Sequence, residues 1–344
     1  MTTTDNPAAT RRSGAPQTSP PELTGPAGAA SFTSLLHRLK SGGTILGFLL
    51  LVIVFGTLRP DVFLSFGNLR NVLEQVAILA IVAAVQSVVM VVGNFDLSVG
   101  ATASLAGAVV AQLMIAGYGI TLSVLAALAV GAVVGAVNGY LTAYLKLSAF
   151  VATLATMTSV SGLTFIVTNG ATLFGLPKEF MGLGQGRWLE MPNPIFVALA
   201  VSLLVWFVLR HTTLGRRWHA IGGNAEVAKL SGVNVSLMRF AAFVVAGLGS
   251  ALAGIVLTSR LASATATSGD SYMLLAIAAV FLGMTISKEG QANVGGTLIG
   301  VGILGVLSNG LNIVGVSTYV QQFLTGAIIV AAVAFSRLSN KGVS

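Results

Sequence analysis

The chain contains no cysteine and only three histidines among its 344 residues. Without cysteine it can form no disulfide, thiolate metal site or cysteine nucleophile. The histidines are scattered, and no cluster of acidic residues accompanies them, so zinc and di-iron centres are not expected. We therefore expect no metal site, no bound cofactor and no catalytic residue in this chain.

Charged residues are also scarce, at 8% of the sequence, where globular proteins carry about 25%. Hydrophobic residues make up 55%, and the mean hydropathy is +0.90. So few charges cannot cover a water-facing surface, and the expected solvent is the lipid bilayer. The net charge of +8 does not indicate nucleic-acid binding, because the basic residues are spread between long apolar runs.

Three regions differ in composition. Residues 1–43 are rich in Thr, Ser, Pro, Gly and Ala and lack apolar periodicity, which predicts a disordered cytoplasmic tail. Residues 44–337 carry the long apolar runs of a transmembrane domain. Residues 338–344 are expected to form a short cytoplasmic tail.

A helix that crosses the hydrocarbon core needs about 20 mainly apolar residues. The apolar runs predict an all-α integral membrane protein, a polytopic bundle of about ten transmembrane helices with a further helix in one long cytoplasmic loop. The predicted spans are 44–58, 73–92, 97–117, 119–145, 149–168, 193–210, 239–258, 272–287, 295–314 and 318–335.

The distribution of Lys and Arg predicts the orientation of these spans. With ten spans and the N-terminal tail inside, 13 of the 18 basic residues fall in inside segments. Positive loops stay in the cytoplasm, so we expect both termini there and the chain in the inner or plasma membrane. The five basic residues outside would be Arg59, Arg70, Lys178, Arg187 and Arg260.

The sequence offers no source of energy for active transport. The acids Glu74, Asp96, Asp270 and Glu289 all fall at span ends, whereas ion-coupled carriers usually need ionisable groups inside the bundle. A phosphate-binding loop of the Gly-x-x-x-x-Gly-Lys-Ser/Thr type is also absent. Active transport would therefore need a partner ATPase; a stand-alone carrier or channel is the alternative, and a membrane-embedded hydrolase is a distant third because no catalytic set converges.

The most informative segment is the long cytoplasmic loop at about 211–238. Asn224 is a favourable N-cap, residues 225–231 favour a short helix, and Gly232 can take the left-handed position that ends it. The sequence therefore predicts a capped surface helix in this loop. An alternative to a partner contact is that the loop is an amphipathic segment that rests on the membrane interface through Arg216, Arg217 and Trp218.

Several runs resemble one family of transport proteins. Residues 215–232, Gly-Arg-Arg-Trp-His-Ala-Ile-Gly-Gly-Asn-Ala-Glu-Val-Ala-Lys-Leu-Ser-Gly, are similar to the coupling loop of permease subunits in the ribose, xylose and arabinose family of ATP-binding-cassette importers. Residues 93–100, 148–157, 295–300 and 309–315 resemble further blocks of that family in the same order. The chain departs from it at Tyr272-Met-Leu-Leu, where members often carry two acids, and at Ser148, where proline is common.

This resemblance implies a function and a set of partners. The chain would translocate a monosaccharide or related small polar solute delivered by an extracytoplasmic binding protein. It would pair with a second, identical or related permease subunit, and a sugar-type ATPase would hold ATP-Mg and drive it. The coupling contact with that ATPase would include Arg216, Gly222, Gly223, Asn224, Glu226, Ala228, Leu230 and Gly232.

Polar side chains inside the spans are candidates for the translocation path, because sugars need hydrogen-bond donors and acceptors. The alternative role for the uncharged ones is hydrogen bonding between helices. Asp96 is expected mainly to cap a helix starting near Leu97, with ligand contact or gating as the alternative. The candidates are Gln86, Asp96, Thr102, Asn138, Asn309 and Asn312.

Overall fold

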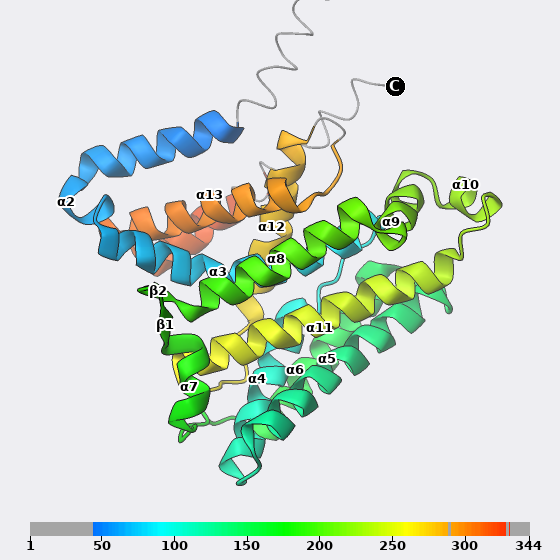
Figure 1. Cartoon of the computed structure of the whole chain (residues 1–344), viewed down its shortest axis with the longest axis horizontal. Helices are drawn as coiled ribbons and strands as arrows, with labels where there is room; N and C mark the ends of the chain where they lie inside the picture. Colours follow the sequence, from blue (N-terminus) through cyan, green and yellow to red (C-terminus); the bar gives the residue numbers. More distant parts are fainter. Residues whose placement is uncertain (1–43, 288–289, 328–329, 331–344) are drawn as a thin grey trace, which may run out of the picture. The chain divides into compact units, whose positions relative to one another are not determined.

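The computed structural model describes residues 44–287, 290–327 and 330, so the predicted tails 1–43 and 338–344 lie outside the described residues. The described chain is almost entirely helical (Figure 1). An apolar helix, Thr44–Leu58, comes first. The elements that follow are α2 (Pro60–Phe63), α3 (Phe66–Val91), α4 (Val99–Ile115), α5 (Ile120–Ala143), α6 (Ala149–Thr168), α7 (Lys178–Gln185), β1 (Arg187–Trp188), β2 (Met191–Pro192), α8 (Asn193–His211), α9 (Thr213–Gly223), α10 (Ala225–Leu230), α11 (Val235–Leu261), α12 (Asp270–Ile286) and α13 (Val294–Ile313).

Six of these helices, α3, α5, α6, α8, α11 and α13, are long and apolar enough to cross a membrane. Thr44–Leu58, α4 and α12 are apolar but shorter. Another helical segment begins at 318, and the second part of the predicted span 318–335 falls largely outside the described residues. The structure therefore supports a multi-pass helical membrane protein, and the number ten stays a prediction.

Helix caps explain where the predicted boundaries are wrong. The helix expected from 73 begins at Phe66, because Ser65 accepts a hydrogen bond from the N–H of Asn68 at 3.1 Å. The helix expected from 239 begins at Val235, where the Asn234 side chain accepts from the N–H of Leu237 at 3.0 Å. In both cases polar residues that the hydropathy pattern assigns to a loop continue the helix.

Helix α7 and the β1–β2 hairpin were not predicted from the sequence. The hairpin turns at Leu189 and Glu190, which both have positive φ, at 48° and 62°. The left-handed region is unfavourable for residues other than glycine, so the sequence carries no turn signal at this position. The Glu190 carboxylate pairs with the Arg70 guanidinium of α3 at 2.6 Å, which holds the tip of the hairpin.

Helix α11 runs through the interior and packs against α3, α4 and α5. On α5, three glycines at four-residue spacing face α11, and a Cβ added to any of them would meet it. A Cβ on Gly131 would meet the backbone of Gly247 and the side chain of Ala251. A Cβ on Gly135 would meet the backbone of Phe243 and Val244, and one on Gly139 would meet Phe240. Small residues at this spacing let helix backbones approach closely. The α5–α11 contact is therefore made largely by main chain.

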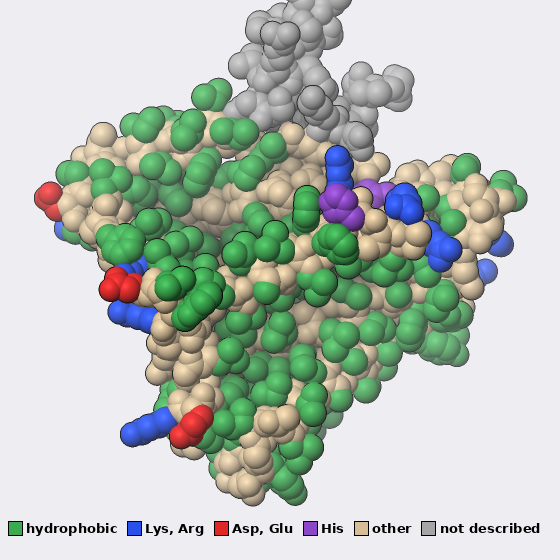
Figure 2. Space-filling model, in the orientation of Figure 1, with side chains coloured by type: hydrophobic (Ala, Val, Ile, Leu, Met, Phe, Trp, Pro, Cys, Tyr) green, Lys and Arg blue, Asp and Glu red, His purple; other side chains and the backbone are tan. Residues whose placement is uncertain are grey.

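The two ends of the bundle carry different elements. Helices α9 and α10 lie at one end, called here the coupling end, and α2, α7 and the hairpin lie at the other, called the hairpin end (Figure 1). On the face shown in Figure 2, the coupling end carries basic and histidine side chains, whereas red and blue side chains are mixed at the hairpin end.

Candidate coupling surface and translocation path

Helix α9 is fastened to the bundle by an indole and a glycine. Trp218 is 1% exposed and donates its indole N–H to the carbonyl of Met238 on α11 at 2.8 Å. A Cβ at Gly222 would collide with the carbonyl oxygen of Val91, at the end of α3. Through these contacts α9 fixes the position from which α10 starts.

Helix α10 has a complete cap at each end, as the sequence predicts. The Asn224 Oδ1 accepts hydrogen bonds from the N–H groups of Glu226 and Val227, at 2.9 and 3.1 Å. After its last turn, Gly232 has φ +83° and donates to the carbonyl of Lys229, while the next N–H, of Val233, reaches the carbonyl of Ala228. This pair of bonds is a Schellman motif, so the six-residue helix needs no outside partner to close its ends.

The side chains of α10 divide into one anchor and an exposed set. Ala228 is buried against the bundle, whereas Val227 is 57% and Leu230 is 86% exposed. Arg216, Gly223 and Glu226 are also exposed. We call Gly223, Glu226, Val227 and Leu230 the coupling surface. Apolar side chains exposed together among polar residues mark candidate sites of contact with a protein or a membrane.

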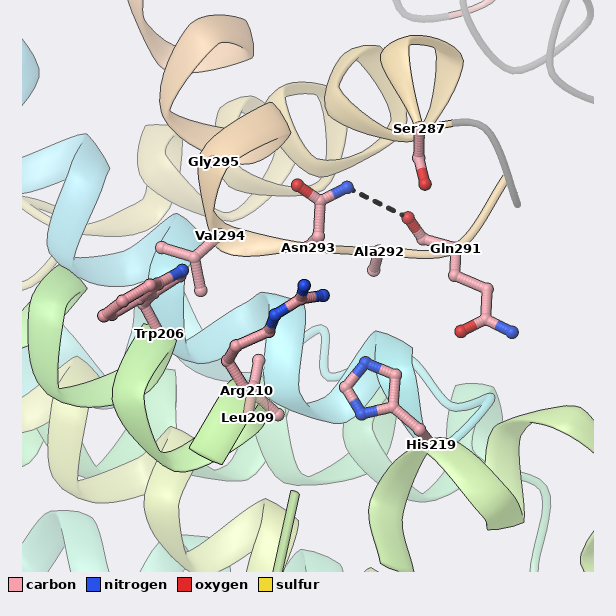
Figure 3. A pocket seen from close by; sticks show the side chains of 10 residues that line it. All are labelled: Trp206, Leu209, Arg210, His219, Ser287, Gln291, Ala292, Asn293, Val294 and Gly295. Atoms are coloured by element: carbon pink, nitrogen blue, oxygen red, sulfur yellow. Dashed lines mark hydrogen bonds between the residues drawn. The ribbon is translucent and has the colours of Figure 1, made fainter. Parts of the chain in front are cut away.

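Two hollows lie at the coupling end. One, of about 930 Å³, lies beside α10, and its charged lining is Lys146, Glu226, Lys229 and Arg239. The other, of about 600 Å³, lies between α8, α9 and the α12–α13 connection. Figure 3 shows Arg210 and His219 on one side of this second hollow and Asn293 with Gln291 on the other.

A third cavity lies in the half of the bundle towards the hairpin end and has a volume of about 490 Å³. Its walls come from the middle of α3, the first turns of α12, the last turns of α11 and α13, and the helical segment after 318. Apolar side chains alternate there with hydrogen-bonding ones, among them Gln75, Arg260, Tyr272, Ser308, Gln321 and Gln322. Such a lining is typical of a pocket for a small polar solute.

Two of the candidate path residues hold the start of α4. The helix begins at Val99, later than expected, and Asp96 is not its N-cap: the Asp96 carboxylate accepts from the backbone N–H of Ser98 at 2.8 Å and from its hydroxyl at 2.7 Å. The Asn138 amide of α5 donates to the same hydroxyl at 2.7 Å. Asp96 and Asn138 are thus brought together in a buried cluster that ties α4 to α5.

The other candidates lie apart from this cluster. Asn309 of α13 exchanges two hydrogen bonds with Asn68 of α3, at 2.9 and 3.0 Å. Asn312 accepts at 2.7 Å from Gln321, which lines the third cavity. Gln86 and Thr102 are buried, and the Gln86 amide has no hydrogen-bond partner among the described residues. None of the six candidates lines the third cavity itself.

The lining of that cavity is the candidate feature that sequence reasoning missed. Its residues are spread from Gln75 to Gly326 and approach one another only in the fold. The adjacent pair Gln321-Gln322 inside an apolar span is a sequence signal that could have pointed to it. Within the described ranges, no group of three or more His, Cys, Asp or Glu side chains could hold a metal ion.

Comparison with known proteins gives a consistent result over most of the chain. It is 43% identical to the ribose import permease protein of Bacillus subtilis over 308 residues, which cover 89% of this chain and 94% of that protein. It is 33% identical to the D-allose transport system permease protein of Escherichia coli over 87% and 92% of the two chains. It is 34% identical to the L-arabinose transport system permease protein of the same organism over 87% and 91%. No solved structure matches the chain.

The family model "Branched-chain amino acid transport system / permease component" matches residues 68–333, from the start of α3 to near the end of the last apolar run. The names of these similar proteins describe permeases of sugar import or transport systems. The family model and the similar permeases agree, and the chain belongs to this family of transport-system permeases as a membrane subunit.

Proposed function

We propose that this chain carries a monosaccharide across the inner or plasma membrane as the permease of a binding-protein-dependent importer. A separate sugar-type ATPase that holds ATP-Mg drives it through the coupling surface. The observation that carries the proposal is α10, a helix closed at both ends whose apolar side chains Val227 and Leu230 face away from the chain. The family match favours this reading over a stand-alone carrier.

The construction of α10 suits the transmission of force. A helix that moves as a rigid body must keep its own hydrogen bonds, and α10 closes them locally through Asn224 and Gly232. A motion of α10 would reach the bundle through α9. Trp218 of α9 is hydrogen-bonded to α11, and Gly222 of α9 packs against the end of α3. A rigid-body shift at the coupling surface would thus displace two long helices together. Arg216, also exposed, lies on α9 beside this contact.

The charges support a cytoplasmic coupling end. Lys146, Arg210, Arg216, Arg217, Lys229 and Arg239 lie at or beside the coupling loop, which is the side where positive loops are retained. Thr44 also lies on this side, since its hydroxyl meets that of Thr285 at the end of α12 at 2.7 Å. We place the N-terminal tail in the cytoplasm on this basis, and the C-terminal tail with it on the charge distribution.

The third cavity is the proposed entrance of the translocation path. It lies in the half of the bundle away from the coupling surface, where a binding protein would deliver its cargo, and it offers amide, hydroxyl and phenol groups to a sugar. A second copy of the chain or a related permease would complete the path. The names of the similar permeases make ribose, allose and arabinose the first substrates to test.

Replacement of Gly223 by Trp tests the coupling surface. The space around this glycine is open, with nothing within 4 Å of an added Cβ, so the variant chain should fold and insert normally. We expect it to lose co-purification of the ATPase. Gly162→Trp is the matched control, because that helical glycine on α6 also has open space around it and should retain the ATPase. Retention of the ATPase by Gly223→Trp, with uptake unchanged, would exclude α10 as the coupling element.

The orientation can be tested with single cysteines, because the chain has none of its own. Leu230→Cys on α10 and Leu189→Cys on the hairpin are both at exposed positions, 86% and 73%. A membrane-impermeant maleimide should label Leu230→Cys only in inside-out vesicles and Leu189→Cys only in right-side-out vesicles. The reverse pattern would place α10 outside the cell, where no ATPase could reach it.

A further inference from the structure

The third cavity contains one charged side chain, Arg260, near the end of α11. Its Nε donates to the Glu74 carboxylate of α3 at 2.8 Å, and both side chains are partly exposed, at 23% and 29%. A guanidinium carries five N–H donors, and this contact uses one edge. The remaining edge has no hydrogen-bond partner among the described residues.

The backbone at Arg260 is held as firmly as its side chain. A Cβ at Gly184 of α7 would overlap the backbone of Arg260, and the Gln185 amide donates to its carbonyl at 3.1 Å. The preceding residue, Ser259, accepts from the N–H of Gly184 at 2.7 Å and donates to the carbonyl of Phe180 at 2.6 Å. Three elements, α3, α7 and α11, therefore fix where the guanidinium lies.

Hydrogen-bonding groups of other helices share the cavity with this cation. Tyr272 of α12 contributes a phenol, Gln75 lies one residue beyond Glu74 on α3, and Ser308 and Gln321 come from α13 and the segment after 318. A planar guanidinium beside an aromatic ring and neutral amides suits a neutral polyhydroxylated ring, because neighbouring hydroxyls can accept from its parallel N–H groups. Because Glu74 already pairs with this cation, the site is ill suited to an anionic solute, and its polar groups do not suit a purely apolar one.

We propose that Arg260 is a substrate-binding residue of the path, donating to the hydroxyls of a monosaccharide, and that Glu74 is its positioning residue. This inference rests on the proposed function and adds the groups that touch the sugar. Arg260 gains its fixed direction from Glu74 and from the backbone contacts of α7. The departure of this chain from its family at Tyr272-Met-Leu-Leu lies in the same cavity wall.

The test uses proteoliposomes that contain the whole importer, with labelled D-ribose, D-allose and L-arabinose as probes. Two rates are measured, sugar uptake and the ATP hydrolysis stimulated by the loaded binding protein. In Arg260→Gln we expect uptake to fall at least about tenfold, since hydrogen bonds to a charged group are lost, while hydrolysis stays within about twofold of the wild type. The number of sugars moved per ATP therefore falls, which a loss of assembly would not produce.

Further variants separate binding from a purely structural ion pair. Arg260→Lys keeps the charge opposite Glu74 but loses the planar donors, and we expect uptake to fall about threefold or more. The double variant Arg260→Glu with Glu74→Arg keeps an ion pair but moves the guanidinium, and should transport as poorly as Arg260→Gln. Arg70→Gln, which breaks the ion pair with Glu190 outside the cavity, is the control and should transport normally.

The outcomes are distinguishable. Full uptake in the swapped double variant would show that only the ion pair matters and would overturn the proposal, as would normal uptake in Arg260→Lys. If Arg260→Gln does not assemble, Arg260→Lys and the swapped variant decide the question. A wild-type importer that moves none of the three sugars would instead contradict the proposed substrate class, whatever the variants do.

Discussion

The α5–α11 interface and the cavity between α3, α12 and α13 are built in opposite ways. At the interface, an added Cβ on Gly135 or Gly139 would lie 2.9 Å from a Cα of α11, because the two helix backbones approach closely there. At the cavity, the helices stand apart around about 490 Å³ of space with a partly polar lining. The first region can hardly change without unfolding, whereas the second can open or close through side chains.

This contrast indicates where movement occurs during transport. Packed interfaces are bistable rather than continuously deformable, and the glycine contacts should hold α5 and α11 together as one body. Helices α12 and α13 border the cavity and are joined at the coupling end by the segment that lines the hollow in Figure 3. We therefore expect alternating access to move α12 and α13 relative to the α5–α11 body.

The largest expected effect is that of Gly135→Leu. The new side chain would overlap the backbone of Phe243 and Val244, and overpacking of this kind costs about 3 kcal/mol or more. Purified Gly135→Leu in detergent should show a strongly lowered melting temperature or fail to accumulate in the membrane. Gly162→Leu, on the open face of α6, should melt close to the wild type; equal losses in both variants would remove the contrast.

Filling the cavity should block transport without lowering stability. Ser308 lies on α13 and lines the cavity, so Ser308→Trp should reduce sugar uptake by about tenfold or more, because the solute and the indole compete for one space. The melting temperature should stay near that of the wild type. Leu298→Trp, on the same helix but outside the cavity lining, is the control and should transport normally. Wild-type uptake by Ser308→Trp would place the path elsewhere.

A smaller effect is expected at the contact between α3 and α13, where Asn309 and Asn68 exchange their hydrogen bonds. Asn309→Leu removes both of these hydrogen bonds and leaves the buried Asn68 amide without its partner on α13. We expect the free energy of unfolding to fall by about 1 to 2 kcal/mol. The double variant with Asn68→Leu should recover part of this loss, because both polar groups are then gone. Thermal unfolding in detergent measures both; normal stability but lost uptake in Asn309→Leu would assign this residue to the path.

The smallest effect is expected for Asp96→Asn. The carboxylate accepts from Ser98 and Asn138, and an amide oxygen at the same place can accept these bonds. We expect a stability change below about 1 kcal/mol and uptake within about twofold of the wild type. Complete loss of uptake in a normally assembled importer would instead give Asp96 a role in gating.

How well the sequence predicts each feature depends on how local its causes are. Helix α6 lies where hydropathy places it, at 149–168, because a run of apolar residues decides it. Helix α10 lies where Asn224 and Gly232 place it, because both caps act within a few residues. The coupling contact with the ATPase stays a prediction, since no partner chain is present to test it.

Features that depend on distant residues were not predictable in this way. The hairpin turns at Leu189 and Glu190, whose positive φ values are stabilised by contacts such as the Arg70 pair rather than by a glycine or asparagine. The cavity forms where five helical segments meet. Hydropathy predicts these segments, but it does not predict which side of each one lines the cavity. Asn138 and Asn309 were chosen as polar residues in apolar spans, and the pattern alone does not distinguish a path residue from one that bonds helix to helix.

Because the N-cap and the C-terminal cap of α10 lie within its own sequence, the helix can form in the same way in another permease. Residues 224–232 contain the N-cap, the exposed apolar side chains and the left-handed glycine, and only Ala228 is buried against the rest of the chain. We therefore expect that these nine residues can be exchanged between related permeases. Such an exchange would change which ATPase is bound and leave the transported solute the same.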